Sequence, residues 1–193
     1  MKIRNGFVSN SSSSSFVVGF EKVPATVEEL MGMMFDENRD SVSLGYYEDG
    51  DYHTYEIAER VFIDMQGQER VDREYFEKVI SEGWFEGYPE TDYSKTTPSE
   101  KFRRKYEEEH DGQSIYDDEK AKKEWQAMLQ KEWDIENAKI DEAAKVYADK
   151  YWPELSDLIC YHFTYGDEDG PFYATLEHGN IFEKLLHVQI SHH

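Results

Sequence analysis

The stretch from Asp117 to about Trp152 constrains the fold more than any other part of this sequence, because neither Gly nor Pro interrupts it before Pro153. At about 1.5 Å per residue, an α-helix of this length would extend roughly 50 Å. Apolar side chains recur on one helical face, at Trp125, Leu129, Trp133, Ile140, Ala143, Ala144, Tyr147 and Tyr151. A stripe this broad, without a strict heptad seam, predicts packing against the chain's own sheet or helices and disfavours a coiled-coil dimer.

Shorter segments on both sides of this helix alternate between helix and strand signals. Helices are predicted at Val27–Phe35 after the N-cap Thr26, from Thr54 as N-cap to Met65, at Arg73–Ser81 after Asp72, and from Ser99 to about Glu109. Strands are predicted at Phe16–Phe20, Ser41–Tyr47, Leu158–Tyr165, Phe172–Leu176 and His187–Ser191, and the turn over residues 166–170 would join the third and fourth into a hairpin. This order predicts an α+β fold, in which several helices, including the long one at about 117–152, pack with a small, mainly antiparallel sheet.

Length and composition bound the class of protein. A chain of 193 residues has the size of one ordinary domain, and we predict a single domain over residues 1–193. The net charge of −21 argues against direct binding to nucleic acid, because this field repels phosphate. No apolar run approaches the roughly 20 residues that a membrane helix needs, so no membrane partner is expected. The single cysteine, Cys160, excludes an intrachain disulfide and fits a reducing compartment.

The charge is unevenly distributed along the chain. Residues 21–98 hold 20 acidic and 7 basic residues, whereas residues 1–20 hold two basic residues and no acidic one. Rows of carboxylates can imitate the phosphates of a nucleic acid and bind a protein with a basic surface, although acidity also serves solubility alone. The predicted turn that carries Glu48, Asp49 and Asp51 is the candidate partner-binding patch.

A serine-rich element forms residues 1–15, with Ser9 and Ser11–Ser15 surrounding Asn10. Serine stretches are commonly flexible linkers. Hydroxyl and backbone N–H groups in a tight loop can also surround an anion, which makes Arg4, Ser11, Ser12 and Ser13 candidate anion-binding residues. The glycine pattern of a phosphate-binding P-loop is missing, so a nucleotide is not the expected anion.

Histidines concentrate at the C-terminal end of the chain. Imidazoles together with a carboxylate suit zinc or another divalent metal, and the candidate ligands are Glu177, His178, His187, His192 and His193. No His-Glu-x-x-His motif or cysteine pair supports them, so ordinary surface or core histidines remain the alternative. Glu132 and Glu136, four residues apart on the long helix, form a second carboxylate pair that either binds a metal or faces solvent. No other cofactor is predicted.

The opening residues 1–18, MKIRNGFVSNSSSSSFVV, resemble the start of many otherwise dissimilar, uncharacterised proteins of tailed bacteriophages and bacteria. The ending, at residues 176–179, 181–182 and 191–193, is similar to a group of uncharacterised phage proteins. The resemblance implies a phage-type protein made in the cytoplasm of a bacterial host, and it carries over no catalytic residue. An N-terminal element shared by dissimilar proteins suggests a transferable role, such as recognition by a common partner.

These patterns together favour a non-enzymatic acidic protein that engages a host or phage protein through a basic surface of that partner. One alternative is a small metal-dependent hydrolase that uses the C-terminal histidines and Glu177. Another is a virion or assembly component that docks through its N-terminus. The oligomeric state does not follow from the sequence.

Overall fold

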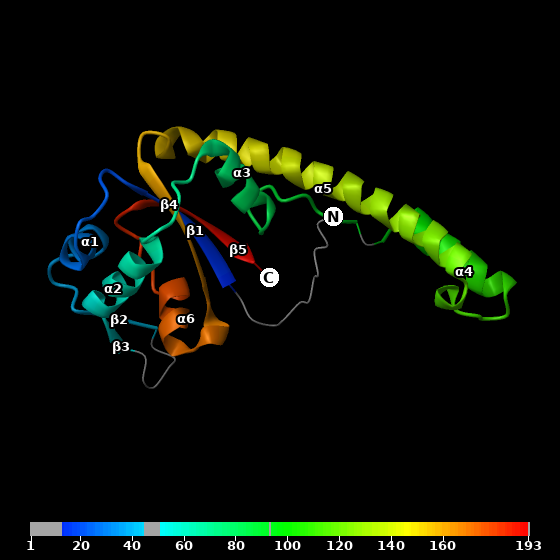
Figure 1. The fold of residues 1–193 in the computed structure, drawn as a ribbon, viewed down its shortest axis with the longest axis horizontal. Helices are drawn as coiled ribbons and strands as arrows, with labels where there is room; N and C mark the ends of the chain where they lie inside the picture. Colours follow the sequence, from blue (N-terminus) through cyan, green and yellow to red (C-terminus); the bar gives the residue numbers. More distant parts are fainter. Residues whose placement is uncertain (1–12, 45–50, 93, 193) are drawn as a thin grey trace. The chain divides into compact units, whose positions relative to one another are not determined.

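The computed structural model describes residues 13–44, 51–92 and 94–192, and it confirms the predicted α+β class. The strands are β1 (Ser13–Phe20), β2 (Ser41–Ser43), β3 (Asp51–His53), β4 (Ile159–Gly166) and β5 (Leu186–His192). The helices are α1 (Val27–Met34), α2 (Thr54–Met65), α3 (Arg73–Ser81), α4 (Pro98–Glu109), α5 (Glu119–Leu155) and α6 (Pro171–His178), with short 3-10 turns η1 (Ile115–Asp117) and η2 (Asp167–Asp169). Figure 1 shows these elements in chain colours.

Backbone contacts divide the chain into two compact units. The sheet unit comprises Met1–Glu86 and Ala144–His193, and the helical unit comprises Gly87–Ala143. Helix α5 contributes its first part to the helical unit and its last part to the sheet unit. The single domain over residues 1–193 stays a prediction.

The sheet unit is built on a three-stranded antiparallel sheet in the order β4-β1-β5. Central strand β1 pairs Ser13 with Gly166 on one side and with His192 on the other, and the register continues without a bulge to Gly19. Since side chains alternate along a strand, the even-numbered residues of β1 lie on one face and the odd-numbered residues on the other. The β-branched and aromatic residues from Phe16 to Phe20 favour this conformation.

One face of the sheet is aromatic. This aromatic face carries Phe16, Val18, Phe20, Tyr161, Phe163 and Tyr165, and apolar residues of α1, α2 and α6 cover it. The Phe182 ring lies 5.4 Å from the Phe16 ring and 5.3 Å from the Phe163 ring, between centroids. Burying such side chains contributes about 1.5–3 kcal/mol each, so this layer supplies much of the stability of the sheet unit.

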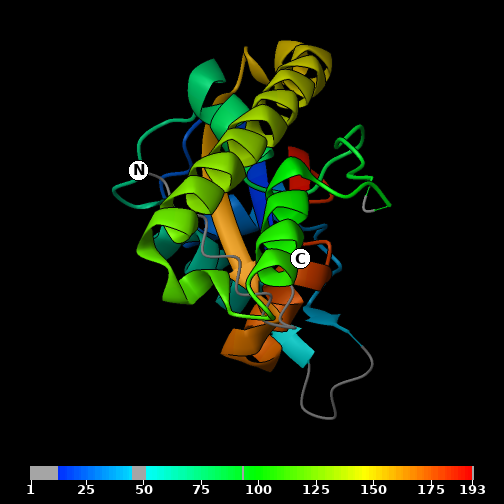
Figure 2. The same cartoon turned by 90° about the vertical axis from the view of Figure 1, so that its right-hand side faces the viewer.

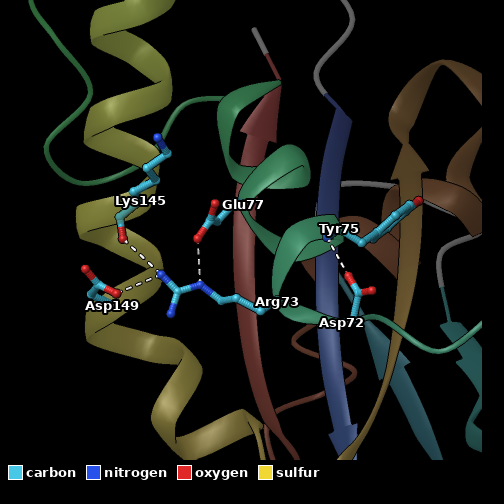
Figure 3. A network of polar contacts seen from close by, with 6 residues as sticks. All are labelled: Asp72, Arg73, Tyr75, Glu77, Lys145 and Asp149. Carbon is cyan, nitrogen blue, oxygen red and sulfur yellow. Dashed lines mark hydrogen bonds and ion pairs between the residues drawn. The ribbon is translucent and has the colours of Figure 1, made fainter.

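The opposite face is aliphatic near one end of the strands and polar near the other. Val17, Cys160, Val188 and Ile190 pack there against α3 and the last part of α5. Arg73 of α3 donates to Glu77 over 2.8 Å, to Asp149 over 2.7 Å and to the Lys145 carbonyl over 3.4 Å (Figure 3). The same figure shows Asp72 accepting from the backbone N–H of Tyr75 over 2.8 Å, the N-cap predicted for α3. Because these groups are partly exposed, the network orients α3 more than it stabilises the fold.

The residues that flank α3 reach the two outer edges of the sheet. The Val71 N–H, before α3, donates to the Cys160 carbonyl of β4 over 2.9 Å, and the Trp84 N–H, after α3, donates to the Ser191 carbonyl of β5 over 2.7 Å. The second contact needs a glycine at position 83, where a Cβ atom would lie 2.4 Å from Ile190 Cγ2. Helix α3 therefore covers the aliphatic face, and the residues that flank it form backbone hydrogen bonds to both edge strands.

The helical unit contains an antiparallel pair of helices, α4 and the first part of α5 (Figure 2). At one end, Ser99 donates from its N–H over 2.8 Å and from its hydroxyl over 2.6 Å to Glu132. Although burial raises the pKa of Glu132, the hydrogen bonds from Ser99 outweigh it, and the pKa is lowered. Glu136 accepts from Thr91 and Lys139. Both carboxylates of the predicted pair are thus occupied by partners within the unit.

Several predicted elements need correction. Strand β1 begins at Ser13 and not at Phe16, because the hydroxyls of Ser14 and Ser15 find partners inside the protein. The hairpin strand predicted at Phe172–Leu176 is wrong, since α6 occupies it with Pro171 in its first turn, where proline is favourable. Helix α5 continues past Pro153 to the buried Leu155.

Two predicted helix caps are also wrong. Thr54 is the first residue of α2, and its hydroxyl donates to the Arg39 carbonyl, while His53 is the N-cap. Thr97 is the N-cap of α4, whose first residue is Pro98, and Ser99 binds Glu132 instead. The helices predicted at 27–35 and 73–81 are confirmed, the first ending at Met34.

Candidate functional site

The predicted metal ligands are divided between the two faces of the sheet. His187 and His192 lie five residues apart on β5, so they point to opposite faces. The His187 ring lies 6.4 Å from the Phe16 ring on the aromatic face, whereas His192 Nε2 lies 2.7 Å from Ser15 Oγ on the other face. His193 lies outside the described residues. Within the described ranges, no group of three or more His, Cys, Asp or Glu side chains could hold a metal ion.

The structure does bring Glu177 and His178 together at the end of α6. His178 Nε2 lies 3.5 Å from Glu177 Oε2. The Ser14 hydroxyl donates to Glu177 Oε1 over 3.1 Å, and the Gln189 amide donates to Ser14 Oγ over 3.2 Å. The Glu177 side chain is 1% exposed, and its Oε2 has no hydrogen-bond partner among the described residues. We call Ser14, Glu177 and Gln189 the carboxylate cluster.

On the opposite face, five polar side chains form a continuous chain of contacts across all three strands, the polar row. Tyr75 Oη lies 3.1 Å from His162 Nδ1, and His162 Nε2 lies 3.3 Å from Thr164 Oγ1. Thr164 Oγ1 lies 3.1 Å from Ser15 Oγ, which lies 2.7 Å from His192 Nε2. The chain ends where His192 Nδ1 lies 3.3 Å from the Glu82 carbonyl oxygen.

The polar row has one consistent direction of donation when both imidazoles are neutral. The Glu82 carbonyl can only accept, so His192 Nδ1 carries the proton and Nε2 accepts from the Ser15 hydroxyl. Ser15 then accepts from Thr164, which accepts from His162 Nε2–H. Burial lowers the pKa of His162, which favours the neutral ring that this arrangement needs.

Two adjoining hollows lie beside β4. One, of about 370 Å³, is lined by Gln68, Glu69, Arg70, Asp72, Tyr75 and His162. The other, of about 210 Å³, shares Gln68 and His162 and adds residues of α2, β4 and α6. In the smaller hollow the Tyr165 hydroxyl donates to Asp64 over 3.2 Å. Burial and the Asp64 charge raise the pKa of Tyr165 well above its ordinary value, so this phenol remains a neutral donor.

The candidate partner-binding and anion-binding residues are described only in part. Of the partner-binding patch, Glu48 and Asp49 lie outside the described residues, and Asp51 is exposed on β3. Of the anion-binding set, Arg4, Ser11 and Ser12 lie outside them, and Ser13 is the first residue of β1.

Asp51 lies on β3, an element that contacts α6. Its neighbour Tyr52 contacts Phe172 of α6, with ring centroids 5.0 Å apart, and η2 places three consecutive acids just before that helix. We call Asp51, Asp167, Glu168 and Asp169 the acidic end. None of the four forms an ion pair with a described Lys or Arg.

Most described cations of the sheet unit, in contrast, have carboxylate partners within the unit. Six of them form such ion pairs: Lys22, Arg39, Arg60, Arg73, Lys150 and Lys184. Because these cations are already paired, the unit's unpaired carboxylates, including the acidic end, remain in excess on its surface.

None of the helices in the described part of the chain has the length and apolar character to cross a membrane. Comparison with protein-family models, with curated proteins and with solved structures finds no match for this chain.

Proposed function

We propose that this chain is a non-enzymatic binding protein whose partner is a protein with a basic surface. The observation that carries the proposal is the acidic end, where four carboxylates form no ion pair with a described cation, while most of the unit's described cations are paired elsewhere. Carboxylates in this state keep their charge available for a partner, and they accelerate association with an oppositely charged surface. The net charge of −21 extends this attraction beyond the contact itself.

The resemblance of the N-terminal element to phage and bacterial proteins supports a partner of bacterial or phage origin. It also leads us to propose the cytoplasm of a bacterial host as the place of action. The hydrolase alternative has less support, because the chain directs His187 and His192 to opposite faces of the sheet.

The test is capture of a partner from a bacterial lysate by the immobilised full chain, eluted with increasing salt. The neutralised variant carries Asp51→Asn, Asp167→Asn, Glu168→Gln and Asp169→Asn. A matched control in the helical unit removes the same charge through Glu107→Gln, Glu108→Gln, Glu109→Gln and Asp111→Asn. We expect a basic protein that the wild type and the control retain at low salt and that the neutralised variant loses.

Equal retention by both variants would exclude the acidic end as the binding surface. Failure of the wild type to retain any basic protein would overturn the proposed function. Loss of retention by both variants would assign the attraction to total charge and not to this surface.

A further inference from the structure

We propose that the outer edge of β4 takes an extended segment of the partner as an additional strand, with a basic side chain in the larger hollow. This inference rests on the proposed function only for the basic character of the segment. The edge itself is defined by the backbone of β4 and by the hollows beside it.

Backbone geometry identifies which groups of β4 face outward. In an antiparallel sheet, both polar groups of a residue point to the same side, and successive residues alternate. Val71, which is outside the sheet, donates to the Cys160 carbonyl, so Cys160, His162 and Thr164 direct their backbone groups away from β1. Beyond Cys160, no described residue forms a backbone hydrogen bond with this edge, which leaves His162 and Thr164 available to a new strand.

Beyond Cys160, to which Val71 is bonded, the edge of β4 lacks the features that normally prevent strand addition. Edge strands are protected by lysines, prolines, inward-pointing charges, bulges or a covering segment. Residues 159–166, ICYHFTYG, contain no Lys, Arg, Asp, Glu or Pro, and the pairing with β1 has no bulge. Thr164 is exposed. At the opposite edge, Trp84 already forms a bridge with Ser191 of β5.

The hollows lie where an added strand would place its side chains. Residues of both parities, His162 to Tyr165, line the smaller hollow, so it opens at the strand edge and not over one face. An added strand directs alternate side chains to opposite faces, and pockets for those side chains give such complexes their specificity. The larger hollow carries two acids, Glu69 and Asp72, against one cation, Arg70, and this net negative charge suits an arginine or lysine.

A basic partner is a better occupant than a second copy of this chain. Two copies would each bring a net charge of −21 to the same contact, and the repulsion opposes association. An extended basic segment instead combines main-chain hydrogen bonds with favourable charge.

Amide hydrogen exchange by NMR on the full chain tests the edge directly. In the free protein we expect slow exchange at Tyr161, Phe163 and Tyr165, which bond to β1, and fast exchange at His162 and Thr164. Slow exchange at His162 and Thr164 in the free protein would show that the edge is already covered and would overturn the proposal.

The probe for binding is the synthetic peptide Lys-Thr-Val-Arg-Val-Thr-Lys with blocked ends. At saturation, we expect it to slow exchange at His162 and Thr164 by about tenfold or more, with little change at the three inward residues. The same peptide with proline in place of its two valines keeps the charge but loses backbone donors, and it should give no protection. Unchanged exchange with the first peptide, or equal protection by both, would contradict strand addition.

Variants separate this proposal from the proposed function. Glu69→Lys reverses a charge in the larger hollow and should weaken the peptide's affinity about tenfold, whereas Glu154→Lys, an equal change on exposed α5 surface, should leave it nearly unchanged. Equal losses of affinity in the two variants would show that the larger hollow does not bind the peptide's basic side chain. If Glu69→Lys still retains the basic protein from lysate as the wild type does, the proposed function stands and the β4 edge does not. If the peptide binds as predicted but no lysate protein is retained, the β4 edge stands as a binding site and the proposed function does not.

Discussion

Two neighbouring serines of β1 meet opposite kinds of polar surroundings. Ser14 points to the aromatic face, where it donates to a buried carboxylate whose other oxygen has no described hydrogen-bond partner. Ser15 points to the other face, where it joins a row of polar groups that form hydrogen bonds with one another from Tyr75 to the Glu82 carbonyl. In the carboxylate cluster one buried oxygen accepts no described hydrogen bond, whereas every side chain of the polar row has a hydrogen-bond partner.

This difference indicates which of the two clusters stabilises the fold. A row of polar groups that are all hydrogen-bonded orders the strands that it joins. An incompletely paired buried charge costs free energy, and replacing it need not destabilise the protein. The predictions that follow measure this contrast as changes in the free energy of unfolding by chemical denaturation.

The largest effect is expected for Ser14→Ala. The substitution removes the described hydrogen bond to Glu177 Oε1, and a hydrogen bond to a charged group contributes about 1.5–3 kcal/mol. We expect a loss of about 2–3 kcal/mol. Ser13→Ala, one residue earlier on the same strand, is the matched control and should change stability by less than about 0.5 kcal/mol. Equal losses at both positions would mean that strand propensity, and not the carboxylate, decides the cost.

Ser15→Ala should cost less, about 1–2 kcal/mol, because the groups it leaves are neutral. Water can replace the Ser15 hydroxyl at His192, which is partly exposed, and at Thr164, which is exposed. Chemical denaturation of the two single variants side by side gives the order. A loss larger than that of Ser14→Ala would reverse the contrast between the clusters.

Glu177→Gln should change stability in the opposite direction, with a gain of about 1 kcal/mol at neutral pH. The amide retains an acceptor for Ser14 and removes a charge that is only partly compensated. Asp36→Asn, at an exposed carboxylate paired with Lys184, is the control for a change in net charge alone and should have almost no effect. A clear loss with Glu177→Gln would show that the contact of this carboxylate with His178 outweighs the cost of its burial.

The smallest effect concerns the response of the polar row to acid. The pKa of His162 in the folded protein is lowered, first by burial, from the ordinary value of 6.5. The unfolded chain therefore binds the proton more readily, so stability is intact above pH 6.5 and falls as the pH drops through 6.5 toward the folded pKa. We expect His162→Gln to reduce the loss of stability between pH 7 and pH 5, relative to the exposed control His53→Gln. An unchanged pH dependence would contradict the neutral row.

The sequence was most informative where local chemistry decides the structure. The N-caps Thr26 and Asp72 predict the starts of α1 and α3, and the absence of Gly and Pro predicts α5. Alternating aromatic and β-branched residues likewise predict β4 and β5. These signals lie within a few residues of the element that they specify.

The parts that the sequence could not predict depend on distant partners. Ser14 and Ser15 are strand residues because Glu177 and His192, more than 160 positions away, bond to them. The segment from Pro171 alternates like a strand but forms α6, because its apolar side chains pack on the aromatic face. The acidic end also escaped prediction, since only a tertiary contact brings β3, which carries Asp51, to α6, whereas η2 adjoins α6 along the chain.

The position of β1 in the sheet has a consequence for how the chain matures. This first strand lies in the centre, and both of its neighbours, β4 and β5, come from the last 35 residues. At roughly 5–20 residues per second, a ribosome would need on the order of ten to thirty seconds to make the chain between β1 and β5. During that time the apolar stretch from Phe16 to Phe20 has neither of its native neighbours, so the nascent protein depends on chaperones or on rapid completion to avoid aggregation.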